Sequence, residues 1–203
     1  MTDKLSDLQA QLLQLGYTVR ILGSAQAARD YLLESIDPTA TVGIGGSISV
    51  RQTGIAPALE QRGNPVFWHW TAGPEAMAKA RMDANRAEVY LTSTNAITVK
   101  GQLVNIDGFG NRLAAMAFGP GKVCVIVGQN KLCEDLETAM DRIKQLACPL
   151  NARRLGLDTP CARTGKCVDC HSPQRFCNAT LILDCCPGSH PMEILLVRED
   201  LGY

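Results

Sequence analysis

Short apolar runs alternate along this chain with segments that carry apolar residues at helical spacing. Residues 122–128, KVCVIVG, are nearly all apolar, as expected for a strand that is buried on both faces of a sheet. Residues 134–147, EDLETAMDRIKQLA, follow with Leu136, Ala139, Ile143 and Leu146 at helical spacing. Similar pairs recur along most of the chain. Strands that alternate with helices predict a three-layer α/β fold, in which a mostly parallel sheet is flanked by helices.

The 203 residues are expected to form a single α/β domain, 1–203, because no repeat or long linker divides them. Residues 96–108, AITVKGQLVNIDG, alternate apolar and polar residues on both sides of Lys100-Gly101, which predicts a β-hairpin. Three parts of the domain are further distinguished: an N-terminal segment of helix and strand (1–40), a cysteine-rich excursion (159–180) and two closing strands (181–203).

The charge balance excludes some classes of partner. Lys plus Arg and Asp plus Glu both number 20, so the composition gives no reason to expect a nucleic-acid surface. No stretch approaches the ~18 consecutive apolar residues of a membrane span. The first 16 residues, MTDKLSDLQAQLLQLG, are polar and periodic, unlike a secretory signal. The sequence therefore predicts a cytoplasmic protein.

A glycine-rich turn follows one of the predicted strands, in TVGIGGSISV (41–50). Gly45, Gly46 and Ser47 could hold a phosphate or carboxylate, because glycines let the backbone approach a ligand and a helix N-terminus attracts anions. The alternative is a tight strand-to-helix turn without a ligand. Ser49 and Gln52 fit a capping box that would open a helix running to about residue 62.

The segment NIDGFGNR (105–112) places four polar side chains around two glycines. Asp107 is a candidate general acid or base, with Asn111 as a second candidate catalytic residue. Asn105 and Arg112 are candidate ligand-binding residues, and Arg112 could orient an anionic substrate. Alternatively, Asp107-Gly108 forms a turn and Asn111 caps the following helix.

Four of the nine cysteines gather in one polar stretch, CARTGKCVDCHSPQRFC. Cys161, Cys167, Cys170 and Cys177 are candidate metal ligands, because thiolates suit iron–sulfur clusters and zinc and four of them complete either site. An iron–sulfur cluster is the expected cofactor. Structural zinc is the alternative, and free or oxidised thiols are a third option.

Seven segments between residues 41 and 203 together resemble the LUD domain, a family associated with lactate utilisation. They read VGIGGSISVRQTGI, RAEVYLTSTNAIT, GQLVNIDGFGNRLAAMAFGP, GQNK, CPLNARRL, PCARTGKCVDC and LLVREDLGY. The resemblance implies a fold similar to the ribose-phosphate isomerase and coenzyme-A transferase superfamily, in which glycine-rich turns at strand ends contact phosphate or coenzyme-A groups. It also implies that residues 45–47 and 105–112 meet in one cleft.

Three functions follow as hypotheses. The first is a subunit or accessory factor of a system that oxidises lactate or another 2-hydroxy acid, with a cluster that passes electrons to redox partner subunits. The second is a stand-alone enzyme acting on a phosphorylated sugar or a coenzyme-A ester, and the third is a non-catalytic binding or regulatory module. The expected ligand of the cleft is a small anionic metabolite, and the oligomeric state stays open.

Overall fold

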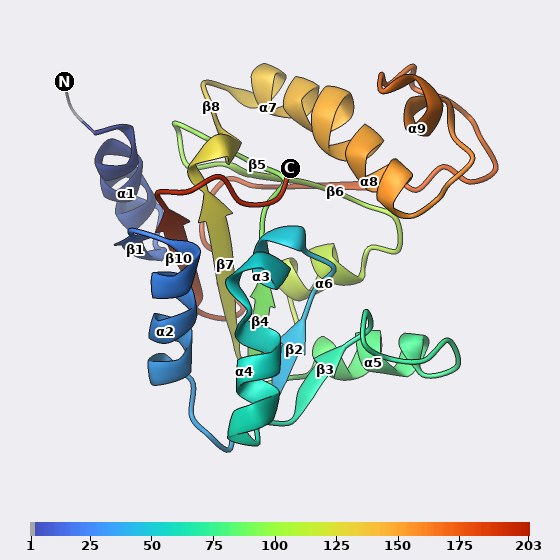
Figure 1. Cartoon of the computed structure of the whole chain (residues 1–203). Helices are drawn as coiled ribbons and strands as arrows, with labels where there is room; N and C mark the ends of the chain where they lie inside the picture. The colour runs from blue at the N-terminus through green and yellow to red at the C-terminus, as the bar shows by residue number, and fades with distance from the viewer. Residues whose placement is uncertain (1–2) are drawn as a thin grey trace.

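The computed structural model describes residues 3–203 and contains two β-sheets (Figure 1). The larger sheet has six strands in the order β1-β10-β7-β4-β2-β3, and every neighbouring pair is parallel. Its strands are β1 (Thr18–Leu22), β2 (Val42–Ile44), β3 (Val66–Trp68), β4 (Val89–Thr92), β7 (Lys122–Gly128) and β10 (Met192–Val197). The predicted parallel sheet is confirmed.

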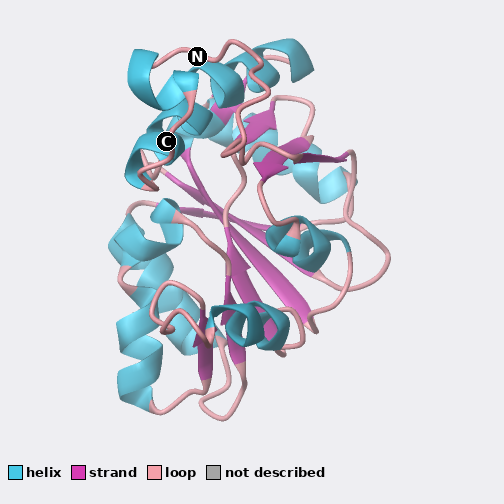
Figure 2. Cartoon of the chain, turned by 90° about the vertical axis from the view of Figure 1, so that its right-hand side faces the viewer, coloured by secondary structure: helices cyan, strands magenta, loops and turns pink. Residues whose placement is uncertain are grey.

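Helices cover both faces of this main sheet, as Figure 2 shows. One face packs against α2 (Ala25–Ser35), α3 (Ile48–Thr53) and α4 (Ile55–Arg62), and the other against α1 (Lys4–Gln14), α5 (Met77–Ala84) and α6 (Asn111–Ala117). In β7, Val123 and Val125 enter one core while Cys124 and Ile126 enter the other. A central strand needs apolar side chains on both faces, which explains the apolar run and confirms the three layers.

The second sheet lies at the end toward which the main-sheet strands run (Figure 1). It has the order β8-β5-β6-β9, with strands β5 (Ala96–Thr98), β6 (Leu103–Asp107), β8 (Leu132–Cys133) and β9 (Ala179–Leu183). β5 and β6 pair antiparallel around Gly101, which confirms the hairpin. The two strands expected near the C-terminus separate, because β9 joins β6 in this small sheet while β10 enters the main sheet.

A long helical stretch packs on the small sheet. It consists of α7 (Leu136–Arg142), a π-helical turn (Ile143–Ala147) and α8 (Cys148–Arg154). Ile143 and Cys148 belong to the apolar cluster that also contains Val104 and Ile106 of the hairpin. The short helix α9 (Pro160–Thr164) then opens the cysteine-rich segment, residues 159–180. Among residues 3–203, no helix is both long and apolar enough to cross a lipid bilayer.

The helix expected between residues 49 and 62 is divided in two and begins earlier. Its N-cap is Ser47, whose hydroxyl accepts from the Val50 N–H, so the capping box expected at Ser49 is wrong. The hydroxyl of Ser49 is instead engaged by Lys131 and Leu201, which lie far along the chain. Gly54, with a φ of 70°, ends α3 and starts α4 in the left-handed conformation that glycine favours.

Candidate functional site

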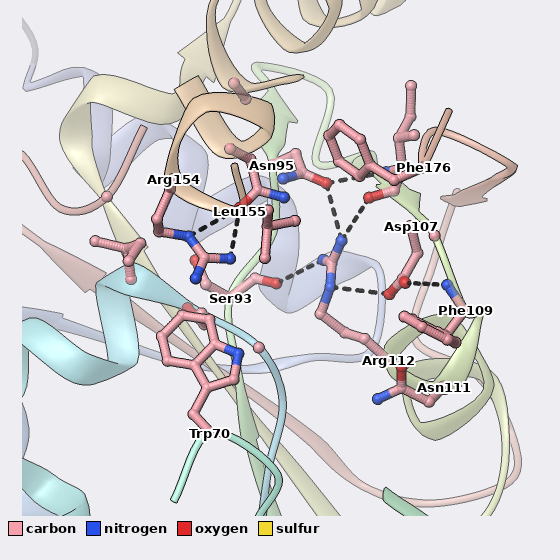
Figure 3. A pocket seen from close by; sticks show the side chains of 18 of the residues that line it. Trp70, Ser93, Asn95, Asp107, Phe109, Asn111, Arg112, Arg154, Leu155 and Phe176 are labelled. Atoms are coloured by element: carbon pink, nitrogen blue, oxygen red, sulfur yellow. Dashed lines mark hydrogen bonds and ion pairs between the residues drawn. The ribbon is translucent and has the colours of Figure 1, made fainter. Parts of the chain in front are cut away.

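A cavity of about 610 Å³ lies at the carboxyl ends of the main-sheet strands (Figure 3). Its walls come from the segments that follow β2, β3, β4 and β7, from the end of β6 and from α8. Ligands of parallel α/β sheets bind at this edge, outside the carboxyl ends of the strands. Its volume falls within the range of small-molecule sites, roughly 300–1,000 Å³. The cavity is therefore the candidate site of the protein.

The glycine-rich turn contributes to one wall. Gly46 and Ser47 line the cavity, whereas Gly45 lies behind them against the core. A Cβ atom at Gly45 would stand 2.9 Å from the Tyr90 hydroxyl oxygen, and one at Gly46 would stand 3.3 Å from Trp70 Nε1. A methyl group at Gly45 would force a neighbouring side chain to shift, whereas one at Gly46 would be in tight contact with Trp70. The Ser47 hydroxyl is used to cap α3.

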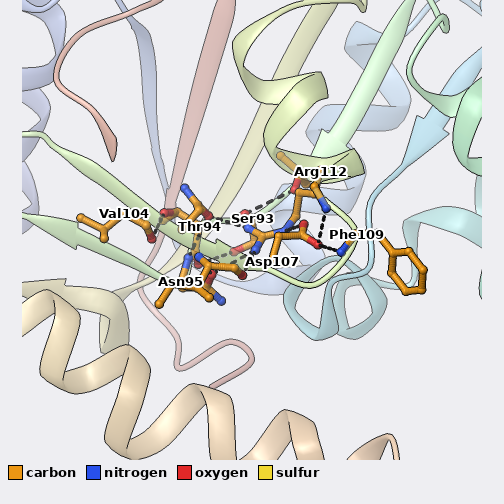
Figure 4. A network of polar contacts seen from close by, with 11 residues as sticks. Ser93, Thr94, Asn95, Val104, Asp107, Phe109 and Arg112 are labelled. Atoms are coloured by element: carbon orange, nitrogen blue, oxygen red, sulfur yellow. Dashed lines mark hydrogen bonds and ion pairs between the residues drawn. The ribbon is translucent and has the colours of Figure 1, made fainter. Parts of the chain in front are cut away.

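The buried guanidinium of Arg112 braces the opposite wall (Figures 3 and 4). Arg112 is 7% exposed, and its Nε lies 3.4 Å from Asp107 Oδ2. Its other N–H groups donate to the Ser93 carbonyl at 3.2 Å, the Ile106 carbonyl at 2.8 Å, Asn95 Oδ1 at 3.0 Å and Asn105 Oδ1. A guanidinium has five N–H donors, so this side chain is fully engaged by the protein. Arg112 therefore fixes the position of this wall, and a ligand would be contacted by other side chains of the lining.

Asp107, Asn105 and Asn111 occupy three different settings. Asp107 lines the cavity at the end of β6, and its Oδ1 accepts from the backbone N–H groups of Phe109 at 3.1 Å and Gly110 at 3.3 Å. Asn111 is the first residue of α6 and also lines the cavity, while Gly110 takes the N-cap position. Asn105 is fully buried behind the wall, where it contacts Arg112.

The cavity lining carries an excess of positive charge. The lining contains four arginines, Arg51, Arg81, Arg112 and Arg154, against one acidic side chain, Asp107. Arg154 lies 4.6 Å from the ring centre of Trp70, and Arg81 lies 4.2 Å from that of Phe109. A partly enclosed space lined by one sign of charge attracts ions of the other sign. The lining therefore has a net positive charge.

His69 adds a neutral polar group to this wall. Burial and, to a smaller extent, the positive charge of Arg81 together lower the pKa of the imidazole to about 4. The ring is therefore uncharged at neutral pH, so it contributes hydrogen bonding rather than charge. It packs beside Gly46 and meets Trp70 edge-on.

Lys131 is a site residue that the sequence reasoning did not single out. It follows β7 in a 3₁₀ turn (Gln129–Lys131), lines the cavity and is 3% exposed. The available signal was a lysine three residues beyond the carboxyl end of a doubly buried strand, within the quoted GQNK motif. Arg81, His69, Trp70 and Arg154 were missed as well, because nothing local in their segments marks them.

Phe176 of the cysteine-rich segment lines the cavity, and so does Cys148 of α8, which lies outside that segment. All nine cysteines are free. Burial and, to a smaller extent, the nearby thiols of Cys177, Cys167 and Cys161 together raise the pKa of Cys148 to about 12. Burial also raises the pKa of Cys177, and Cys167 and Cys170 add to that rise. These thiols therefore share one neighbourhood.

The donor chemistry of this neighbourhood fits a soft metal. In the Cys167-x-x-Cys170 turn, Asp169 has a φ of 46°, and its N–H donates to the Cys167 sulfur at 3.4 Å. Backbone N–H groups that donate to sulfur help to set the reduction potential of thiolate-bound metal clusters. Among residues 3–203, however, no three His, Cys, Asp or Glu side chains are arranged closely enough to hold an ion. The four cysteines are gathered in one segment without being closed around a common centre.

The architecture matches a solved protein fold. A crystal structure of a DUF162 family protein from Deinococcus radiodurans is similar with a TM-score of 0.57, over 96% of both chains and at 11% sequence identity. At that identity the similarity concerns the fold alone. The chain is thus an α/β protein of this architecture, with a cation-lined cavity at the carboxyl edge of its sheet.

The sequence itself decides the family. Residues 5–197 match the profile of the LUD domain, and no curated protein matches the chain. The protein belongs to the LUD domain family, which is associated with lactate utilisation. The resemblance seen in the sequence motifs is therefore confirmed.

Proposed function

We propose that this LUD protein binds a small organic anion in its cavity and acts in the use of lactate or a related 2-hydroxy acid, as a subunit or accessory factor of an oxidising system. The observation that carries the proposal is the charge of the cavity lining, in which four arginines accompany one acidic side chain, Asp107. Arg112 is occupied by protein atoms, so Arg154, Arg81 and Arg51 are the cations that would meet a carboxylate.

Calorimetry with matched ligands tests this proposal. Lactate, glycolate and their 2-oxo counterparts are compared with lactamide, which keeps the shape of lactate and lacks its charge. The acids are expected to bind and the amide is not. Arg154→Ala should weaken binding about tenfold, equal to ~1.4 kcal/mol, whereas Arg153→Ala removes an equal charge from the same helix outside the cavity. Equal binding of lactate and lactamide would exclude the proposal.

The cysteine-rich segment supplies the second half of the proposal. Cys161, Cys167, Cys170 and Cys177 would hold an iron–sulfur cluster, with structural zinc as the alternative. A cluster supplies one-electron transfer when it is bound, which suits a protein that works beside redox partner subunits. Cys148 and Phe176 extend from this neighbourhood to the cavity wall, which supports a functional link between the two places.

One observation favours a second candidate function. The cavity of about 610 Å³ is generous for a three-carbon acid, and its aromatic side chains Trp70, Phe109 and Phe176 offer planar surfaces. A phosphorylated sugar or a coenzyme-A ester would fill more of that space. Displacement titrations distinguish the two candidates. A ligand of this class that binds at least 100-fold more tightly than lactate, a difference of ~2.7 kcal/mol in binding free energy, would favour the larger substrate.

A further inference from the structure

The amine of Lys131 lies within a polar cluster on the cavity wall. Its Nζ is 2.7 Å from Ser49 Oγ, 2.8 Å from Ser93 Oγ and 3.0 Å from the carbonyl oxygen of Thr94. All three partners are uncharged, and the lysine is 3% exposed. Ser93 also accepts from Arg112 through its carbonyl, and Figure 4 shows Ser93 and Thr94 within the polar network of Arg112.

This setting disfavours the ammonium form. Burial lowers the pKa of Lys131 far below its ordinary 10.5, and the positive charges of Arg142 on α7 and Arg112 on α6 lower it further. Desolvation penalises the charged form of a buried amine, and buried lysines act as general bases for this reason. The neutral amine has two N–H donors and one lone pair to distribute among three oxygens.

The neighbouring contacts decide that distribution. Ser49 donates its hydroxyl hydrogen to the Leu201 carbonyl at 3.1 Å, so toward Lys131 it accepts. The Thr94 carbonyl can only accept. Both N–H groups are therefore used, and the lone pair faces Ser93 Oγ. In the structure Nζ donates to Ser93 Oγ at 2.8 Å, and the Ser93 hydroxyl donates to the Thr94 carbonyl at the longer distance of 3.3 Å. In the neutral amine the lone pair takes the place of that third N–H, and the Ser93 hydroxyl can turn to donate to it.

We propose that Ser93 and Lys131 form a nucleophile and general-base pair that accepts an acyl group from an anionic ester or thioester bound in the cavity. The arrangement has the three elements of an activated nucleophile: a hydroxyl within hydrogen-bond reach of a base, and further groups, Ser49 and Thr94, that orient the base. Both Ser93 and Lys131 line the cavity. This inference shares the cavity with the proposed function and does not require that the natural ligand is a 2-hydroxy acid.

The acyl transfer balances with the groups present. Ser93 Oγ attacks the acyl carbon of the ester or thioester while Lys131 Nζ takes the hydroxyl proton. The bond from the acyl carbon to the leaving oxygen or sulfur breaks, and the leaving alcohol or thiol receives that proton from Lys131. Water then attacks the acyl-serine by the same route, which releases a carboxylic acid and restores the Ser93 hydroxyl. No oxidant or reductant is consumed.

The full chain is treated with p-nitrophenyl acetate, and two quantities are followed: the release of p-nitrophenolate, and the mass gain of one acetyl group, located by peptide mass spectrometry. Wild type should release p-nitrophenolate above background and carry acetyl on Ser93. Ser93→Ala should abolish both signals, and Lys131→Met should lower the rate ~100-fold or more. Ser189→Ala, a serine outside the cavity, is the matched control.

A pH profile of the wild type keeps the test independent of whether Lys131→Met folds. Because the pKa of the amine lies well below the 10.5 of an ordinary lysine, the rate should reach its plateau well below pH 10.5. The pair would be refuted by release that survives in Ser93→Ala, by acetyl found on Ser49 instead, by absence of both signals in folded wild type, or by a rate that climbs steadily toward pH 10.5.

Discussion

The guanidinium of Arg112 donates to the carbonyl of Ser93 at 3.2 Å, across 19 positions of the chain. The same side chain reaches the Ile106 carbonyl on β6 at 2.8 Å. Arg112 thereby ties the loop at the end of β4, in the main sheet, to the small sheet. One buried residue, Arg112, therefore fixes the position of the two cavity walls relative to each other.

Removing that residue should cost stability. Arg112→Leu leaves buried acceptors at Ser93, Ile106 and Asn105 without a donor, so we expect a loss of about 2–4 kcal/mol in the free energy of unfolding. Urea denaturation measures it, with the exposed Arg86→Leu as control. A loss no larger than that of the control would mean that the network does not hold the walls.

The glycine-rich turn offers a test by double-mutant cycle. Gly45→Ala would place a methyl group 2.9 Å from the Tyr90 hydroxyl oxygen, a clash expected to cost about 1–3 kcal/mol. Within residues 3–203 that hydroxyl has no hydrogen-bond partner, so Tyr90→Phe alone should change stability little. In the double variant the loss should be smaller than the sum of the single losses. Additive losses would show that the methyl group meets its obstruction elsewhere.

A buried carboxylate on β10 should make stability depend on pH. Burial raises the pKa of Glu193, but hydrogen bonds from Lys122 at 2.6 Å, Tyr31 at 2.6 Å and Arg20 at 3.1 Å outweigh that effect and hold the pKa below 4.5. A carboxyl group with a lowered pKa in the folded state stabilises the protein above its unfolded pKa, and that contribution disappears as the pH falls through the folded value.

We therefore expect Glu193→Gln to lose about 2 kcal/mol at pH 7 and to show a weaker decline in stability below pH 4.5 than wild type. Urea midpoints between pH 7 and pH 3 provide the comparison, and Glu137→Gln on the exposed side of α7 is the control. Parallel curves for wild type and Glu193→Gln would contradict the assignment.

Metal analysis separates the possible uses of the cysteine-rich segment. Protein purified without oxygen should contain iron and sulfide and absorb broadly in the visible range, and Cys167→Ser should lose both properties. Cys185→Ser, which changes an exposed cysteine outside the segment, should retain them. One zinc in colourless protein would support the structural alternative and end the electron-transfer proposal, and protein free of any metal would leave the thiols without a ligand role.

Much of the fold was predictable because its cause is local. The apolar run of β7, the hairpin around Gly101 and the leucines of α1 each carry their own periodicity. The parallel sheet follows from the alternation of strands and helices along the chain. The division into a main and a small sheet was not predicted, since β9 has the same apolar character in either place and long-range pairing decides where it goes.

The site was less predictable because its determinants are distant in sequence. Ser49 looked like a helix cap, yet its hydroxyl contacts Lys131, 82 positions away, and Leu201, 152 positions away. Arg112 looked like a ligand-binding residue in its motif, and only the packed structure reveals that its donors are used internally. His69 and Arg154 become neighbours of the cavity through topology alone.

The binding of an organic anion in the cavity is tested most directly by a crystal structure of the protein with lactate or its 2-oxo counterpart. We expect the carboxylate within hydrogen-bond distance of Arg154 or Arg81, in the space between Trp70 and Asp107 (Figure 3). A cavity that holds only water at ligand concentrations that saturate calorimetric binding, with the acid found elsewhere on the protein, would contradict it.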